Sequence, residues 1–552
     1  MSGFDWSLPY SSRRSPVLAR NVVAASQPLA AHAGLRKLLE GGNAVDAAIA
    51  TAIALTVVEP TSNGIGSDAF AIVWDGTKLH GLNASGRSPA AWTPARFVPT
   101  LSGTMPARGW GSVTVPGAVS GWSALSERFG RLSFEKLFGP AVHYARHGFP
   151  VSPVIARDWA GAAETLKDFP DFARAFLVRG RAPDPGETWS FEDQARTLER
   201  IAETKGEAFY RGEIAEKIAA HAKATGAGAP LLTAQDLAEH QADWVDPISV
   251  DYRGVTLEEI PPNGQGLAAL IALGILEHFP LSEHAVDSAD SVHLQIEAMK
   301  IAFADARRYV ADAGAMEFDP HELLGKDYLA RRARLIDMRK AKSPEFGVPH
   351  EGDTVYLTTA DESGMMVSFI QSNYAGFGSG IVVPGTGISL QNRGSGFTLQ
   401  EGHPNQVGPR KRPYHTIIPA FVTKEGEPLM SFGVMGGPMQ PQGHVQMMVR
   451  IFDYGQNPQA AADAPRWQVL DGPSPAVAGA SARKGGTNVV LEPGVSEEVA
   501  EELSRRGHHV SRGPNAGGAQ LIVKLGRHAS GDLHSGYLAA SEPRKDGQAV
   551  GY

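Results

Sequence analysis

The sequence contains no cysteine and no large excess of charge of either sign. Its 552 residues include 51 basic and 59 acidic side chains, which gives a formal charge of −8. Without cysteine the chain can form no disulfide, thiolate metal site, iron–sulfur cluster or thiol nucleophile. The slight acidity, with no basic block, argues against nucleic acid as a partner.

Long hydrophobic runs are also missing. The most apolar stretch spans residues 44–58, and Asp46 and Glu59 limit its uncharged part to residues 47–58. A membrane-spanning helix needs about 20 apolar residues, so we expect a buried core helix with Asn43 as its N-cap. The first residues show no apolar segment of the kind found in secretory signals. We therefore expect a cytoplasmic protein without a membrane partner.

The character of the chain changes near residue 350. Before it, apolar residues recur at three- and four-residue spacing, which predicts helices over 134–147 (interrupted at Gly139 and Pro140), 194–203, 212–222 and 288–311. After it, β-branched segments separated by Gly and Asp predict strands.

The segments 354–359 and 366–372 predict a β-hairpin. If its turn centres on Glu362 and Ser363, Thr354 lies across from Gln371 or Ser372. Two hydroxyl groups would then meet near one end of the hairpin. Hydroxyl residues are also common on solvated strands, so the pattern alone leaves a functional and a structural interpretation open.

Several motifs of known chemistry are absent or incomplete. Residues 64–69, GIGSDA, resemble a dinucleotide-binding loop, but a helix end and a turn precede them where a strand is required. They predict a tight turn beside some other site. The histidines are scattered without metal-ligand spacing, and His508 and His509 are expected at the surface. No Gly-x-Ser-x-Gly elbow appears. We therefore expect no metal and no cofactor.

Gly436 and Gly437 lie between a predicted strand and the mostly apolar run 445–452. Two glycines in such a turn can expose consecutive backbone N–H groups that hold an oxyanion. A plain strand-to-helix turn explains the same pattern.

Together these features resemble the gamma-glutamyltransferase family of N-terminal-nucleophile hydrolases. The resemblance rests on ordered motifs along almost the whole chain: ASQPLAAHAG at 25–34, LEGGNAVDAA at 39–48, VPGAVSGW at 115–122, PPNGQG at 261–266, GDT at 352–354, GSG at 378–380, GPRKRP at 408–413 and the 436–437 glycine pair. The form GGPMQPQGH at 436–444 is more similar to acylase-like and oxamate-amidohydrolase-like members than to glutathione-cleaving ones.

The resemblance implies an α+β fold, a four-layer αββα sandwich made as a precursor. The chain would cut itself between Asp353 and Thr354 into a large subunit, 1–353, and a small subunit, 354–552, which stay together as a heterodimer and could pair further into a dimer of heterodimers. Thr354 would be the nucleophile and its freed α-amine the base. Ser372 would hold the nucleophile, and Gly436 and Gly437 would form the oxyanion hole.

Departures from the family pattern fall where the substrate is held. The family arginine that binds a substrate carboxylate is replaced by Ser85, with Arg87 two residues later. The family acid that binds the substrate ammonium is replaced by Gly396. The chain also departs from the family pattern at four further positions expected to bind the substrate, namely Tyr374, Arg393, His415 and Thr416. The segment 397–407 is also short for a lid.

These departures remove the groups that would clamp both ends of a zwitterionic amino acid. A buried ammonium without a carboxylate is costly. We therefore expect an amidohydrolase acting on a small carboxylate-bearing amide such as oxamate, or on an acyl amide, with Arg87 or Arg393 binding the carboxylate. The alternatives are a gamma-glutamyltransferase or glutathione hydrolase, and a catalytically silent binding protein with the same fold.

Overall fold

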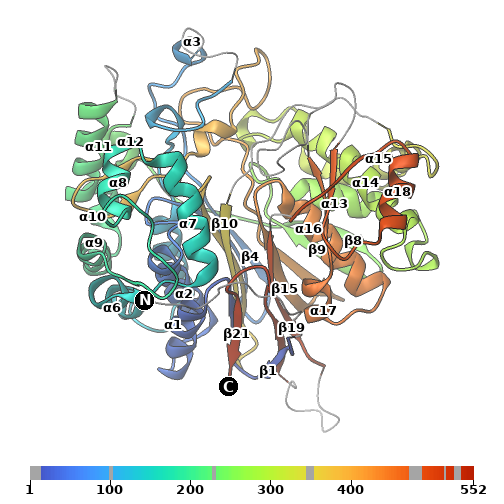
Figure 1. Ribbon diagram of the computed structural model, residues 1–552, viewed down its shortest axis with the longest axis horizontal. Coiled ribbons are helices and arrows are strands. Elements are labelled where there is room, and N and C mark those ends of the chain that lie inside the picture. Colours follow the sequence, from blue (N-terminus) through green and yellow to red (C-terminus); the bar gives the residue numbers. More distant parts are fainter. Residues whose placement is uncertain are drawn as a thin grey trace.

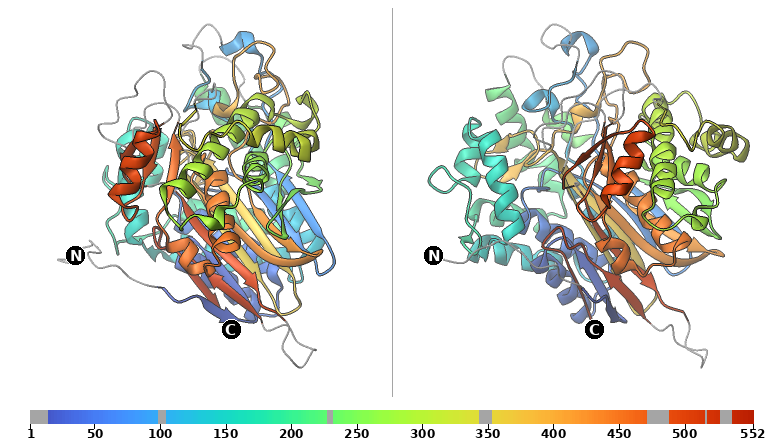
Figure 2. Two further views of the ribbon diagram at one scale, coloured as in Figure 1. Left: turned by 90° about the vertical axis from the view of Figure 1, so that its right-hand side faces the viewer. Right: turned by 45° about the vertical axis from the view of Figure 1, so that its right-hand side comes forward.

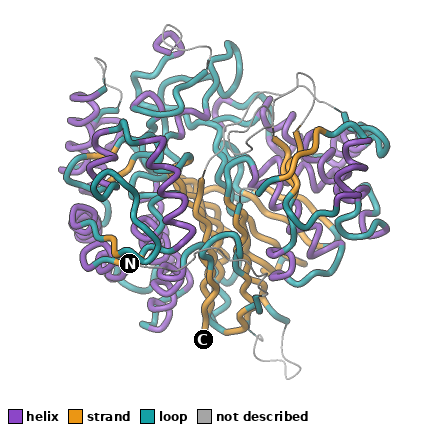
Figure 3. Tube along the Cα trace, viewed as in Figure 1, coloured by secondary structure: helices purple, strands orange, loops and turns teal. Residues whose placement is uncertain are grey.

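The computed structural model describes residues 14–97, 104–226, 232–342, 353–470, 488–514, 517–526 and 536–552. Two seven-stranded sheets lie face to face in the middle of the molecule, and helices cover the outer face of each sheet (Figure 1, Figure 3). The chain therefore forms the four-layer αββα sandwich, an α+β fold, that the resemblance implied.

Both sheets are antiparallel throughout. The first runs in the order β21 (Gln548–Gly551), β2 (Val22–Ala25), β10 (Asp353–Ala360), β11 (Met366–Tyr374), β3 (Asp68–Trp74), β4 (Leu79–Ala84), β7 (Asp243–Val245). The second runs in the order β1 (Val17–Ala19), β20 (Tyr537–Ala540), β19 (Gly518–Lys524), β15 (Glu427–Met435), β14 (Ala420–Lys424), β9 (Val255–Glu259), β8 (Ile248–Tyr252). Each sheet thus combines strands from both sides of the Asp353–Thr354 bond.

The central strands β10 and β11 are covered on both faces. Side chains of a strand point alternately to its two faces. Accordingly Tyr356 and Ile370 pack between the sheets, whereas Val355 and Phe369 pack under the helices of the first sheet. Every residue of β11 is buried. This double burial explains why the segment is apolar or uncharged along its whole length.

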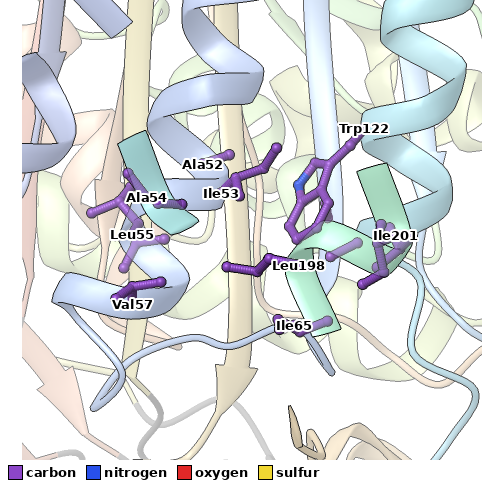
Figure 4. Packing of buried hydrophobic residues seen from close by; sticks show 14 of the residues in the cluster. Ala52, Ile53, Ala54, Leu55, Val57, Ile65, Trp122, Leu198 and Ile201 are labelled. Carbon is purple, nitrogen blue, oxygen red and sulfur yellow. The ribbon is translucent and has the colours of Figure 1, made fainter. Parts of the chain in front are cut away.

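Helices α1 (Pro28–Leu39), α2 (Ala44–Val58) and α4 (Ala118–Phe129) cover the first sheet. The prediction for residues 44–58 is confirmed: Asn43 caps α2 by accepting a hydrogen bond from the Asp46 N–H, and every residue of the helix is buried. Figure 4 shows Ile53 of α2 beside Trp122 of α4. The helix is apolar all round because other elements surround it.

Further helices pack outside this layer: α5 (Phe134–Leu137), α6 (Gly139–His147), α7 (Pro153–Leu166), α8 (Pro170–Phe176), α9 (Glu192–Glu203), α10 (Glu207–Arg211), α11 (Glu213–Thr225) and α12 (Ala234–Ala238). The helix expected over 134–147 is interrupted as predicted, with α6 beginning at Gly139 and Pro140 in its first turn. The short elements α3 (Pro94–Phe97), β5 (Phe149–Pro150), β6 (Thr188–Trp189), β12 (Val382–Val383) and β13 (Ile388–Ser389) complete this side.

Helices α13 (Gly266–Leu276), α16 (Met439–Met448) and α17 (Pro458–Asp463) cover the second sheet (Figure 2). Outside them lie α14 (Ala289–Tyr309), α15 (Lys326–Ala333), α18 (Glu497–Arg505) and a small sheet of β16 (Trp467–Leu470), β17 (Asn488–Leu491) and β18 (His509–Arg512). In the part of the chain that the structure describes, no helix has the length and apolarity needed to cross a membrane.

Candidate active site

Thr354 lies at the start of the hairpin formed by β10 and β11. Val355 pairs with Gln371 and Asp353 pairs with Tyr374, so a register shift places Thr354 opposite Ser372. The two hydroxyl oxygens are 3.3 Å apart, with Thr354 donating, and both residues are buried. The predicted approach of the two hydroxyls is therefore confirmed.

Ser372 is held by the backbone as well as by Thr354. Its Oγ accepts a hydrogen bond from the Tyr374 N–H at 2.8 Å. On the other side of β11, Ser372 pairs in register with Asp68 of β3. The serine is thus fixed between two strands of the first sheet, and its oxygen faces the threonine from a rigid position.

Gly436 and Gly437 form the turn between β15 and α16, with φ of +116° and +58°. Side chains are disfavoured at such angles, which explains the glycines. The Gly436 and Gly437 carbonyls accept from the N–H groups of Met439 and Gln440. Among the described residues, no hydrogen bond uses the N–H groups of the two glycines. Such a turn can present two donors to an anion.

Gln440 is a neighbour of Thr354 that sequence reasoning missed. It lies in the first turn of α16 and is fully buried. Its Nε2 is 3.3 Å from Thr354 Oγ1, and its Oε1 accepts the Ile418 N–H at 2.9 Å. The only signal in the sequence was its place three residues after the glycine pair, which by itself assigns no contact.

Arg393 is a buried cation beside this hairpin, with a side chain 1% exposed. Its Nη1 donates to Thr416 Oγ1 at 2.6 Å, and its guanidinium lies over the Tyr374 ring at 4.6 Å from the centroid. Its Nε and Nη2 have no hydrogen-bond partner among the described residues. Burial lowers its pKa to about 10, while Asp68 and Tyr374 favour the charged form. The group therefore stays cationic near neutral pH.

Thr416 connects the arginine to the glycine turn. Its carbonyl accepts a hydrogen bond from Gln265 Nε2 at 2.6 Å, and the same amide nitrogen donates to the Gly437 carbonyl at 2.9 Å. One buried glutamine thus ties the Arg393 side of the site to the Gly436–Gly437 turn.

His415 pairs with Asp68, and the charge of Arg393 acts on both residues. Its Nε2 is 3.1 Å from Asp68 Oδ2, and its Nδ1 accepts the Ile417 N–H. Burial holds the pKa of His415 well below its usual value, so the ring is neutral. Burial likewise raises the pKa of Asp68 to about 7, against the opposing effect of Arg393.

Asp68 comes from the segment GIGSDA that predicted a turn beside a site. The structure supports that interpretation: helix α2 precedes the segment, and strand β3 begins at Asp68. The side chain accepts hydrogen bonds from the N–H groups of Gly86 and Gly117. Its approach to His415 was not apparent from the sequence because the two residues are far apart along the chain.

Arg87 is engaged elsewhere. Its Nη2 is 3.1 Å from Asp243 Oδ2, an aspartate that also binds Arg412. Among the described residues, Arg87 forms no hydrogen bond with Thr354 or Arg393. Of the two arginines proposed from the sequence, only Arg393 therefore touches Tyr374 and Thr416.

Gly396 has a structural reason to lack a side chain. A Cβ built on it would lie 2.5 Å from the Tyr414 carbonyl oxygen. The short segment that follows is closed by a bridge between Thr398 and Gln406, and its ends, Phe397 and Val407, pack into a small apolar cluster. The backbone thus fills the space that an acidic side chain would need.

The prediction that His508 lies at the surface is wrong. His508 is buried, and its Nε2 lies 2.8 Å from Nδ1 of His293 on α14. His293, Glu297 and His508 each place one atom that could bind a metal ion within 4.8 Å of the other two. The ammonium of Lys300 already binds Glu297, and the neighbouring Lys300 and Arg506 charges help lower the pKa of His508 to about 2, after burial. Lys300 thus already compensates the charge of Glu297.

Comparison with known proteins places this site in a family. The family model described as Gamma-glutamyltranspeptidase matches residues 30–552. The chain belongs to this family. It is 36% identical over 541 residues to the glutathione hydrolase-like YwrD proenzyme of Bacillus subtilis, covering 98% of this chain and 99% of the relative.

Two further relatives carry different activities in their names. The oxamate amidohydrolase proenzyme of Klebsiella pneumoniae is 34% identical over 550 residues, covering 98% and 99% of the two chains. The crystal structure of cephalosporin acylase from Bacillus halodurans has a TM-score of 0.91 at 47% identity, covering 100% of this chain and 99% of that one. Family membership therefore identifies an amide-bond hydrolase of the N-terminal-nucleophile type, and its curated relatives are named as proenzymes.

Proposed function

We propose that the protein cuts its own Asp353–Thr354 bond and then hydrolyses an amide with Thr354 as nucleophile. A threonine hydroxyl needs a base, and cleavage frees the α-amine of Thr354 itself. An α-amine has a reference pKa of about 7.7–8.0, so much of it is neutral near pH 7. The contact of Thr354 with Ser372, in a buried and rigid hairpin, supports this assignment.

The remaining roles follow from position. Ser372 accepts the hydrogen bond of Thr354 and orients it. The N–H groups of Gly436 and Gly437 stabilise the oxyanion that forms when the hydroxyl adds to the carbonyl. Expulsion of the amine leaves an ester on Thr354, and water then releases the acid. An amine in place of water would give transfer.

The two products of self-cleavage, 1–353 and 354–552, would remain associated. Strand β10 lies between β2 and β11, so a strand of the small subunit is hydrogen-bonded to one of the large subunit. In the second sheet, β14 pairs with β9 across the same division. Separation of the subunits would break both sheets, which supports a permanent heterodimer.

The substrate's acyl group carries a carboxylate and no ammonium. The observation that carries this proposal is Arg393, a buried guanidinium whose Nε and Nη2 lack partners among the described residues. A buried arginine with two such donors matches a carboxylate in a bidentate pair. An ammonium would meet this cation without the family acid, whose position is Gly396. Oxamate and acyl amides of short dicarboxylic acids are the matching class.

A panel of amides tests the proposal. Purified, processed protein is assayed with oxamate, a glutaryl anilide, an uncharged acyl anilide of equal length, and a γ-glutamyl anilide with and without a dipeptide acceptor. We expect a carboxylate-bearing amide to give the highest kcat/KM. Arg393→Met should raise its KM on the order of a hundredfold, because the substrate charge is left unpaired. Arg87→Met is the matched control, since Asp243 already pairs with Arg87.

Other outcomes identify the alternatives. Rapid, acceptor-stimulated cleavage of the γ-glutamyl anilide would indicate a glutathione hydrolase or transferase, as the name of the Bacillus subtilis relative suggests. A processed protein that cleaves no amide and forms no covalent adduct with an electrophilic analogue would indicate a binding protein. An unchanged KM in Arg393→Met would overturn the assignment of Arg393 to the substrate carboxylate. It would not affect the assignment of Thr354 as nucleophile.

A further inference from the structure

The amide of Gln440 has a fixed orientation at the nucleophile. The Ile418 N–H can only donate, and it lies 2.9 Å from Gln440 Oε1. The amide oxygen therefore faces Ile418, and Nε2 faces Thr354 Oγ1 at 3.3 Å. Because an amide NH2 can only donate, Thr354 Oγ1 must be the acceptor in this pair.

This orientation determines where the threonine proton points. With one lone pair of Oγ1 occupied by Gln440, the hydroxyl of Thr354 donates to Ser372 Oγ. Ser372 also accepts the Tyr374 N–H. Two hydrogen bonds therefore run in one direction, from Gln440 to Thr354 and from Thr354 to Ser372, and all three side chains are buried.

We propose that Gln440 positions Thr354 Oγ and stabilises negative charge on it, in self-cleavage and in turnover; this rests on Thr354 being the nucleophile. In self-cleavage the Oγ–carbon bond forms, the carbonyl carbon's bond to the Thr354 nitrogen breaks, and the hydroxyl proton ends on that nitrogen. Water then releases the Asp353 carboxylate from the ester. In deacylation after turnover, Oγ is the leaving group and regains a proton from the α-ammonium. Each step places charge on the atom to which Gln440 donates.

The substitution Gln440→Glu removes the hydrogen bond that the side chain donates to Thr354 and keeps the one that it accepts from Ile418. The substituted side chain has nearly the same shape and can still accept the Ile418 N–H, but as a carboxylate it cannot donate to Thr354. Gln446→Glu is the matched control on the same helix. Gln446 is buried, accepts the Trp467 N–H and donates only to backbone carbonyls of Gln442 and Trp467. Among the described residues, it forms no hydrogen bond with a residue of the site.

The first readout is the rate of appearance of the two subunits on denaturing gels, which needs no substrate. At pH 8 we expect Gln440→Glu to process more slowly than the parent, by roughly tenfold to a hundredfold. The rate should recover as the pH falls and the new carboxyl group gains a proton that it can donate. Gln446→Glu should process like the parent at every pH, even if its melting temperature falls.

Turnover gives the second readout. For processed protein and the best amide of the panel, kcat should fall by a similar factor while KM changes less than about threefold. Gln440→Met, which removes donor and acceptor, should be slow without recovery at low pH, and it covers the case in which Gln440→Glu does not fold. Parent-like processing in both Gln440 variants, or an equal loss in Gln446→Glu, would overturn the inference. A protein that processes normally but cleaves no amide would overturn the proposed hydrolase function. The role of Gln440 in self-cleavage would be unaffected.

Discussion

The Tyr374 ring lies against the Arg393 guanidinium, 4.6 Å from its central carbon. Tyr374 has a φ of +78°, a region that bulky residues rarely adopt. Tyr374→Asn should fold well, because asparagine tolerates this φ and its backbone N–H can still donate to Ser372. Loss of the buried cation–π contact, worth about 2 kcal/mol, should raise KM for a carboxylate substrate by roughly tenfold. Steady-state kinetics and a melting curve check this. A fall in kcat at constant KM would contradict it.

The lack of room at Gly396 leads to a second prediction. Because a Cβ there would lie 2.5 Å from the Tyr414 carbonyl, Gly396→Ala should lower the free energy of unfolding by about 1–3 kcal/mol. Gly396→Asp should be no more stable and should not create γ-glutamyl specificity. Urea denaturation gives the free energies. The control is Gly161→Ala in the exposed part of α7, where a Cβ meets nothing within 4 Å and alanine favours the helix. Equal stability of Gly396→Ala and the parent would contradict the prediction.

Self-processing is expected to depend on the Thr354 hydroxyl. Denaturing gels of fresh parent protein should show two chains, 1–353 and 354–552, whereas Thr354→Ala should remain one chain of 552 residues. Thr354→Ser keeps a hydroxyl and an α-amine, so it should process, at a reduced rate because serine is less restrained about χ1. Amino-terminal sequencing of the smaller chain should begin at residue 354. A parent protein that stays intact and yet turns over an amide would rule out this mechanism.

Local signals in the sequence predicted much of the fold and the centre of the site. Asn43 and the mostly apolar run after it predicted α2, and the strand–turn–strand pattern brought Thr354 to Ser372. The register differs by a single residue from a turn centred on Glu362 and Ser363. These features are set by residues close together in the chain, where periodicity and turn chemistry carry the information.

What the sequence did not reveal depends on contacts between distant segments. Gln440 reaches Thr354 only because β15, which leads into α16, packs against β10, and Asp68 meets His415 across 347 residues. His508 was expected at the surface because charged residues surround it. It instead turns inward after Gly507, which has a φ of +99°, and meets His293 of α14. No local pattern encodes such a partner.

The buried His508 should make stability fall in acid. Burial holds its pKa near 2, whereas the unfolded chain binds the proton near 6.5. As the pH falls below 6.5 the unfolded state gains a proton that the native state does not, so stability drops by about 1.4 kcal/mol per pH unit. His508→Gln can keep the donor to His293 and removes the titration. Its advantage over the parent in urea denaturation should grow by about 2 kcal/mol between pH 7 and pH 5. His321→Gln, at an exposed histidine, is the control. A constant difference would refute the prediction.

The buried carboxyl group of Glu59 should make the stability fall as the pH rises, opposite to the effect of His508. Its side chain is fully buried, one carboxyl oxygen accepts the Ser26 hydroxyl at 2.6 Å, and burial raises its pKa from 4.5 to about 7. Between these values the unfolded chain loses its proton while the native state keeps it, so stability falls as the pH rises through that window. The full loss above pH 7 is about 3 kcal/mol.

Glu59→Gln tests this directly, because the amide can still accept the Ser26 hydroxyl and does not titrate. Its free energy of unfolding relative to the parent should rise by about 3 kcal/mol from pH 4.5 to pH 8. Glu362→Gln, at a carboxyl group in the exposed turn of the β10–β11 hairpin, serves as the comparison. The two effects have opposite signs and cancel where their windows overlap, so these two groups alone give the parent a broad stability maximum between about pH 4.5 and pH 6.5. If the relative stability of Glu59→Gln does not change with pH, the carboxyl group is ionised in the native state and burial does not control it.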